Sequence, residues 1–258
     1  MDNNKIIQSL WIGDFLSPIE LLCINSYLQN DHEFHLYTYN AINNIPKGVK
    51  VYNANEIVNK TNIFLDSHNG FASFSDYFRY KLLFDKGGWW VDMDTVCLRY
   101  FDFQDEYCFA TEKINIGKGD IVANTYIKSP SNSEFLKDCI NYIEEEPFEE
   151  VIWGSFGPFF LTKVLELYDS RNYITPNEIF CPIPWYEINK LLFDYEYLLP
   201  HESRAVHLWN ERWRIEKRNK YETYNPFSLF EKLKCRYKIS ENLQGNLSYL
   251  NQPKHQTI

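Results

Sequence analysis

The chain has 258 residues, a net charge of −9, and 45% hydrophobic and 17% aromatic residues. This composition supplies enough apolar material for a full core and excludes an intrinsically disordered chain. The 35 acidic residues outnumber the 26 basic ones, which argues against a general nucleic-acid-binding protein, because such proteins neutralise phosphates with Lys and Arg. The acidic excess is compatible with a cation-dependent enzyme, in which carboxylates hold a metal that binds an anionic substrate.

The cysteine pattern and the hydropathy indicate a cytosolic protein. No segment approaches the roughly 20 apolar residues of a membrane-spanning helix, and the first 13 residues do not have the pattern of a signal peptide. The six cysteines show neither C-x-x-C pairs nor metal-finger spacing: Cys23, Cys97, Cys108, Cys139, Cys181 and Cys235. We therefore expect a cytoplasmic location and reduced thiols.

The first hundred residues alternate between strand and helix signals. A β-branched and aromatic run over 6–12 predicts a strand, and Ser17-Pro18 begins a helix as N-cap and first helical residue. Residues 34–39 and 49–52 predict two more strands. A helix over 72–86, closed by Gly87-Gly88, precedes a hydrophobic strand over 89–91. This order predicts an α/β domain with a mostly parallel sheet.

The second half of the chain predicts helices over 132–145 and 159–168 and a proline-punctuated connection over 176–184. Residues 214–238 carry eight basic residues against three acidic ones, namely Arg214, Lys217, Arg218, Lys220, Lys232, Lys234, Arg236 and Lys238. Apolar residues at helical spacing, Phe227, Phe230, Leu233 and Tyr237, accompany them. Two interpretations stay open: peripheral contact of 214–238 with the anionic inner face of a membrane, or a helix packed on the domain with a solvated basic face. The second is favoured, and beyond Ser240 we expect frayed chain.

Residues 74–95 carry the chemistry. Asp76 and Arg79 lie three apart on the predicted helix and share a face. Asp92 and Asp94 follow the buried strand at positions i and i+2, so they point the same way at the edge where open α/β sheets bind ligands. Oxygen ligands of this kind suit Mg²⁺ or Mn²⁺. The simpler alternatives are solvated carboxylates at a strand end and a surface ion pair between Asp76 and Arg79.

The spacing from Ser75 and Asp76 through Arg79, Leu83 and Gly87-Gly88 to Asp92 and Asp94 resembles the signature of the DXD sugar transferases. This group is glycosyltransferase family 32 and its relatives, which include capsular polysaccharide transferases and the catalytic domains of large clostridial glucosylating toxins. Residues 5–13, 49–58, 154–162 and 205–213 resemble other segments of that family. A histidine usual in the first of these segments is absent, and Ser9 is an unusual neighbour there.

The resemblance covers about 5–213 and implies a GT-A fold, a Rossmann-like nucleotide-diphosphate-sugar transferase domain. We expect one catalytic domain over 1–213, with a donor half over about 1–110 and an acceptor half over 111–213. A basic, helical C-terminal extension over 214–258 would follow it. Transfer would retain the anomeric configuration, and no nucleophile is evident in the sequence.

The resemblance also assigns roles to single residues. Asp92, Asp94 and His207 would bind Mn²⁺ or Mg²⁺ against the donor diphosphate, with Asp92 near the ribose. A lone histidine is more often structural, but the nearby Trp209 and Trp213 favour the ligand role. Catalysis would rest on Asp76, Arg79 and Asp94: Asp76 would bind hydroxyls of the donor sugar, and Arg79 the sugar or its phosphate.

The remaining contacts are predicted from the same resemblance. Ser9, Leu10 and Trp11 would flank the base of the nucleotide-sugar donor. Asn124, with its neighbour Tyr126, and Trp153 and Gly157 would line the acceptor cleft, although ordinary loop structure explains these residues equally well.

The sequence thus predicts a metal-dependent, retaining glycosyltransferase. It would move a hexose from a nucleotide-sugar, by resemblance a UDP-sugar, to a glycan or lipid-linked glycan of a capsule, O-antigen or lipooligosaccharide. Alternatives are a toxin-like protein glucosyltransferase, a non-catalytic module that binds carbohydrate or nucleotide-sugar, and a metal-dependent phosphodiester hydrolase, which would normally need more ligands.

Overall fold

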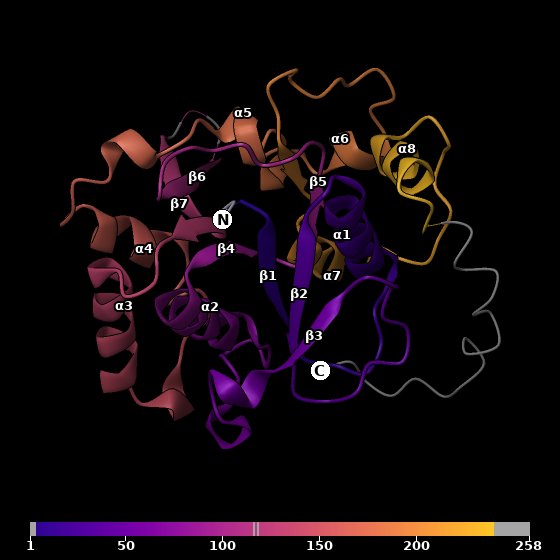
Figure 1. The fold of residues 1–258 in the computed structure, drawn as a ribbon. Coiled ribbons are helices and arrows are strands. Elements are labelled where there is room, and N and C mark those ends of the chain that lie inside the picture. Colours follow the sequence, from indigo (N-terminus) through magenta and orange to yellow (C-terminus); the bar gives the residue numbers. More distant parts are fainter. Residues whose placement is uncertain (1–3, 116, 118, 240–258) are drawn as a thin grey trace.

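The computed structural model describes residues 4–115, 117 and 119–239 (Figure 1). A six-stranded sheet runs through the molecule in the order β3-β2-β1-β4-β7-β6. Its strands are β1 (Ile6–Trp11), β2 (Glu33–Thr38), β3 (Lys50–Asn53), β4 (Gly88–Val91), β6 (Cys108–Lys113) and β7 (Asp120–Ser129). The four strands from β3 to β4 are mutually parallel, and β7 lies antiparallel to both β4 and β6. The expected α/β class and the parallel, Rossmann-like half of a GT-A fold are therefore confirmed.

A second, two-stranded antiparallel sheet pairs β5 (Thr95–Cys97) with β8 (Ala205–His207). The helices are α1 (Pro18–Gln29), α2 (Ala72–Lys86), α3 (Glu134–Glu145), α4 (Pro158–Leu165), α5 (Asn177–Phe180), α6 (Asn189–Leu192), α7 (Asn210–Ile215) and α8 (Leu229–Arg236). Short 3-10 helices span Ala54–Glu56, Lys60–Asn62, Phe148–Glu150, Arg171–Tyr173 and Trp185–Glu187. Among the described residues, no helix is long and apolar enough to cross a bilayer.

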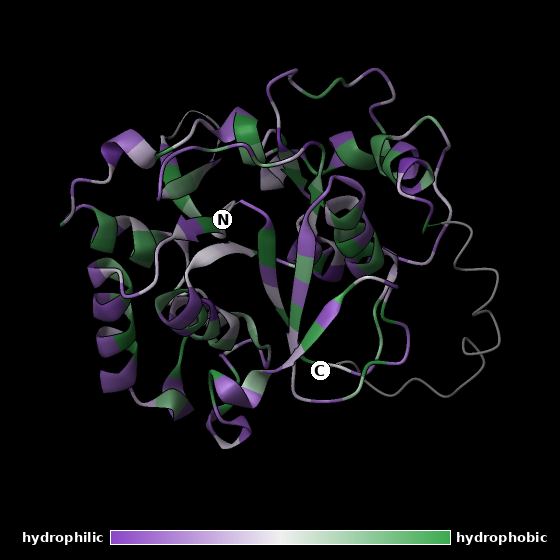
Figure 2. Ribbon diagram, viewed as in Figure 1, coloured by the Kyte–Doolittle hydropathy of each residue, from purple (hydrophilic) through white to green (hydrophobic). Residues whose placement is uncertain are grey.

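Helices cover both faces of the sheet, and strand alternation decides which residues each helix meets. Ile7 and Phe34 point to one face and pack with α1, whereas Leu10 and Trp90 point to the other and pack with α2. The helix α3 flanks α2, and its hydrophobic side faces inward while its hydrophilic side faces solvent (Figure 2). Two layers of core thus enclose the sheet, as in other α/β folds.

Local sequence signals set the ends of α1 and α2. Ser17 and Glu20 form a capping box at the start of α1, and Pro18 occupies the first turn as predicted. The helix α2 matches the predicted span 72–86. Gly87 ends it with φ +65°, and a Cβ there would lie 2.6 Å from the backbone nitrogen of Ser131. Only glycine fits this turn, which directs the chain into β4.

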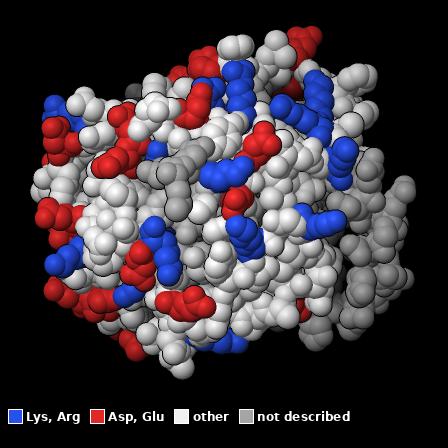
Figure 3. All heavy atoms as spheres, in the orientation of Figure 1, with Lys and Arg blue, Asp and Glu red and all other residues white. Residues whose placement is uncertain are grey.

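The C-terminal helix α8 is packed on the body of the protein. Phe230, Leu233 and Tyr237 are buried in the core cluster that also holds α1, and the Tyr237 hydroxyl donates to the Cys97 carbonyl oxygen at 2.6 Å. Lys and Arg side chains gather on the surface over α8 (Figure 3). This arrangement matches the packed interpretation of 214–238. The fourth apolar residue, Phe227, differs from the expected helical face: it precedes α8 and is 66% exposed. The expectation of frayed chain beyond Ser240 lies outside the described residues.

Candidate active site

The two DXD carboxylates follow the carboxyl end of β4 and meet a histidine from the far end of the chain. The β5–β8 ladder pairs Thr95 with His207, which places the imidazole beside Asp94. His207 Nε2 lies 3.1 Å from Asp94 Oδ2, and the backbone N–H of Asn210 donates to the same oxygen at 2.6 Å. Ligand atoms of Asp92, Asp94 and His207 all lie within 4.8 Å of one another. The structure therefore brings together the three residues predicted to bind metal.

An unusual backbone conformation holds the aromatic residue beside this histidine. Trp209 has φ +58°, a left-handed conformation that large side chains rarely adopt, and it is the N-cap residue immediately before α7. Its ring lies against the His207 ring with centroids 3.9 Å apart, and its Nε1 donates to the Ile183 carbonyl oxygen. A strained residue in contact with a candidate ligand is typical of a functional site.

Arg79 lies at the centre of the cluster and is buried. Its five N–H groups all have partners within the protein. It pairs with Asp76 Oδ1 at 2.9 Å and Asp92 Oδ1 at 3.1 Å, and it donates to the Asn124 carbonyl oxygen at 2.6 Å. The other two N–H groups donate to Ser75, and the Trp90 ring lies 5.0 Å away. The pair with Asp76 is thus no surface ion pair but part of a buried network that joins the two carboxylates.

Asp76 connects this network to the predicted acceptor residues. The Asn124 side-chain amide donates to Asp76 Oδ1 at 2.8 Å. A Cβ built on Gly157 would lie 3.6 Å from Asp76 Oδ2, and the Tyr80 hydroxyl fastens this loop by donating to the Phe156 carbonyl oxygen. Asn124 and Gly157 therefore both lie close to Asp76.

The other predicted contact residues are buried or contact other parts of the protein. Tyr126 is fully buried, and Trp153 is 43% exposed with its ring stacked on His68. In the first strand the side chains of Ser9 and Leu10 are buried, and Trp11 donates from Nε1 to the Phe15 carbonyl oxygen. Roles of Ser9, Leu10 and Trp11 toward the donor, and of Trp153 toward the acceptor, remain predictions.

The electrostatics of the site favour a cation. Burial raises the pKa of Asp76 to about 6 although Arg79 opposes this shift, and burial likewise raises the pKa of Asp92. Burial alone would also raise the pKa of Asp94, but the charge and hydrogen bond of His207 and the N–H of Asn210 lower it. Burial would lower the pKa of His207, yet Asp94 outweighs this effect and raises it. Three carboxylates thus face one guanidinium and one imidazole, and negative charge remains in excess.

One carboxylate near His207, that of Glu112, was not predicted from the sequence. Glu112 on β6 lies with Cys181 and His207 in a group whose ligand atoms are also within 4.8 Å of one another. Burial raises the pKa of Glu112 to about 7. No local motif marks this residue, because its strand pairs with β7, and neither strand was predicted. Only a prediction of both strands and of their register would have placed Glu112 near His207.

The site is therefore a carboxylate and imidazole cluster beside the parallel half of an α/β sheet, a place where this class of fold binds nucleotides. A family model described as glycosyltransferase sugar-binding region containing DXD motif matches residues 19–111. A second, described as alpha 1,4-glycosyltransferase conserved region, matches residues 128–237.

Solved structures of similar fold include two named glycosyltransferases. The PaToxG glycosyltransferase is 17% identical, with a TM-score of 0.45 over 63% of this chain and 69% of that one. The apo form of the glycosyltransferase GlyE of Streptococcus pneumoniae TIGR4 is 12% identical, with a TM-score of 0.49 over 98% of this chain and 66% of that one. No curated protein sequence matches the chain. The two family models and the DXD cluster together identify the chain as a glycosyltransferase of the DXD type.

Proposed function

We propose that this glycosyltransferase requires a divalent cation, Mn²⁺ or Mg²⁺. It would transfer a hexose with retention from a nucleotide-sugar, in our proposal a UDP-sugar, to a cell-surface glycan intermediate. The observation that carries the proposal is the convergence of Asp92, Asp94 and His207 at the end of β4, beside a network that remains negative after Arg79 is counted.

The donor atoms of this cluster fit a divalent cation. Carboxylate oxygens suit Mg²⁺ and Mn²⁺, and an imidazole nitrogen is a common additional ligand for Mn²⁺. His207 Nδ1 is buried without a hydrogen-bond partner in the described part of the chain, so the ring is fixed by its Nε2 contact and by Trp209. When bound, the cation would neutralise the charge that develops on the leaving diphosphate.

The chain's own residues would hold the donor sugar beside this centre. Asp76 Oδ1 is occupied by Asn124 and Arg79, whereas Oδ2, on the side toward Gly157, accepts no hydrogen bond from the described residues. In our proposal Asp76 accepts from sugar hydroxyls through Oδ2. Glycine at 157 leaves room there, because a larger side chain would extend toward this carboxylate. Orientation of the sugar lowers the barrier by fixing the reacting atoms in place.

Arg79 would act by positioning. Since its N–H groups already bind Ser75, Asp76, Asp92 and Asn124, it orients the sugar-binding and metal-binding carboxylates relative to each other. This differs from the direct contact with the sugar or its phosphate that the resemblance implies. The proposal includes no membrane contact, because the apolar residues Phe230, Leu233 and Tyr237 are buried against the domain.

Release of nucleoside diphosphate from a panel of UDP- and GDP-sugars, measured with Mn²⁺ and with EDTA, tests the proposal. We expect release from one donor that depends on Mn²⁺ and is lost in Asp94→Asn. Asp85→Asn is the matched control, because Asp85 is an exposed carboxylate on α2 outside the site. An acceptor added to the successful donor would then give a product whose anomeric configuration NMR can assign.

The same assay can refute the proposal. Release that is equal with Mn²⁺ and with EDTA would contradict metal dependence. If no donor is hydrolysed, donor binding is measured next by calorimetry. Absence of both binding and release across the panel would refute a nucleotide-sugar donor.

A further inference from the structure

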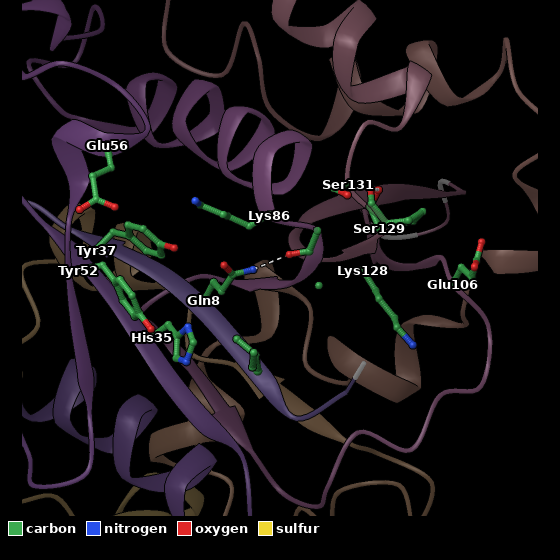
Figure 4. Close-up of a pocket in the computed structure, with 14 residues that line it drawn as sticks. Gln8, His35, Tyr37, Tyr52, Glu56, Lys86, Glu106, Lys128, Ser129 and Ser131 are labelled. Atoms are coloured by element: carbon green, nitrogen blue, oxygen red, sulfur yellow. Dashed lines mark hydrogen bonds between the residues drawn. The ribbon is translucent and has the colours of Figure 1, made fainter. Parts of the chain in front are cut away.

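A cavity lies on the α2 face of the sheet, away from the metal cluster. It has a volume of about 500 Å³, which is the size of a small-molecule site, and it extends over β1, β2 and β3 to the start of β4 (Figure 4). Gln8, Tyr37 and Tyr52 line it from the sheet, and Lys86 lines it from the last turn of α2. None of the residues of the metal cluster is among those that line it.

The helix α2 separates this cavity from the candidate active site. Asp76 lies in its first turns and Lys86 at its last residue, ten positions apart, which corresponds to about 15 Å along a helix. Similarly, Gly88 opens β4 at the cavity whereas Asp92 follows the other end of that strand. The cavity is therefore a site of its own.

Aromatic rings form one wall of the cavity. Tyr37 and Tyr52 stack with centroids 5.2 Å apart and planes 22° from parallel, and His35 packs on Tyr52 at 4.9 Å. Gln8 is fixed beside them, because its side-chain N–H donates to the Gly87 carbonyl oxygen at 2.7 Å. The wall is thus pre-formed, with the two tyrosine rings side by side (Figure 4).

Four polar side chains at this cavity have no hydrogen-bond or ion-pair partner among the described residues. Within residues 4–115, 117 and 119–239, the hydroxyls of Tyr37 and Tyr52, the ammonium of Lys86 and the carboxylate of Glu56 make no hydrogen bond or ion pair. The formal charges of the lining residues cancel, because the cavity is lined by two lysines, Lys86 and Lys128, and two glutamates, Glu56 and Glu106. A polyanion such as a nucleotide gains little here, whereas a neutral ligand with many hydroxyls finds donors and acceptors and the half-buried side chain of Tyr52; the Tyr37 ring beneath is only 3% exposed.

We propose that this cavity is a second carbohydrate-binding site, which holds a neutral saccharide against the Tyr52 side chain with Lys86 and Glu56 bound to its hydroxyls. Occupation of this site does not depend on whether the metal cluster transfers a sugar. A glycan bound there would be retained on the enzyme independently of its contacts at Asp76.

Saturation-transfer NMR on the full chain, without nucleotide or metal, tests this site with lactose, maltose, cellobiose and N,N′-diacetylchitobiose as probes. We expect at least one disaccharide to bind, and Lys86→Ala or Tyr52→Ala to weaken its binding by about tenfold, as the loss of one good polar contact does. Tyr52→Phe, which keeps the ring, should have a smaller effect. Lys81→Ala is the matched control, because Lys81 lies on the same helix but faces Glu144.

The variants also separate this site from the catalytic one. Binding that persists in Asp76→Asn and falls in Tyr52→Ala supports the second site. Binding lost in Asp76→Asn and unchanged in Tyr52→Ala and Lys86→Ala would place the saccharide at the metal cluster and overturn the proposal. Absence of binding by all four disaccharides would overturn it as well, whatever the donor-release assay shows.

Discussion

Replacing Asp76 by asparagine should make the protein more stable while impairing transfer. Asp76 is only 6% exposed, and burial raises its pKa from 3.8 to about 6 despite the ion pair with Arg79. A pKa that is higher in the folded than in the unfolded state means that folding favours the protonated form. The contribution of this group to stability is therefore complete below about pH 3.8 and is lost as the pH rises through about 6.

The magnitude follows from that shift. About two pKa units correspond to about 3 kcal/mol at about pH 7.5, and to roughly half of that at about pH 5, where the folded protein keeps most of the proton. Asparagine carries no charge, and its Oδ1 can still accept from Asn124 and Arg79. We expect Asp76→Asn to raise the free energy of unfolding by up to about 3 kcal/mol at about pH 7.5 and by about half as much at about pH 5.

Urea denaturation with EDTA present, at both pH values, measures this difference. Asp85→Asn on the same helix serves as the control and should change stability little at either pH, because Asp85 is exposed. A gain that is the same at both pH values, or a variant that is less stable than the wild type at both, would refute the reasoning. In either case the buried carboxylate would not be held in a disfavoured charge state.

Three further substitutions test other parts of the site. Arg79→Lys should lower the free energy of unfolding by about 3 kcal/mol in urea denaturation, because lysine cannot hold two carboxylates and a carbonyl in one plane; a loss below about 1 kcal/mol would contradict this. His207→Ala should raise the Mn²⁺ concentration for half-maximal donor release by at least about tenfold. An unchanged Mn²⁺ dependence would show that His207 has a structural role only. Glu112→Gln should weaken Mn²⁺ binding by about fivefold in calorimetry at about pH 8, above the raised pKa of Glu112, since it removes a negative charge near His207; equal affinities would exclude Glu112 from the site.

Residues 72–95 could be predicted well because their structure is local. A helix with a glycine turn and a strand that ends at two aspartates is encoded by neighbouring residues, and spacing alone places Asp76 with Arg79. The pairing of these two elements across the Gly87 turn follows from the short connection. The start of α1, with Ser17 as N-cap and Pro18 as first helical residue, was likewise predicted from neighbouring residues.

The strands β6 and β7 could not be predicted in the same way. The strand β7 pairs antiparallel with β4 and with β6, so the sheet continues beyond residue 110, where the donor half was expected to end. Pairing between strands far apart in the sequence depends on the whole core, and we found no periodic pattern in 108–129 that predicts it. Glu112 and the position of Asn124 beside Arg79 depend on that pairing.

The sequence by itself determined the central helix and strand, the DXD carboxylates at the strand's end and the partnership of Asp76 with Arg79, because each rests on residues a few positions apart. Only the tertiary structure decided that His207, 113 positions after Asp94, contacts the Oδ2 atom of that aspartate. The same holds for the burial of Arg79 between two carboxylates, with a partner for every N–H group. The physical reason is that ligand geometry and pKa values are set by burial and by contacts between distant segments. Those contacts exist only once the β5–β8 ladder and the β4–β7 pair have formed.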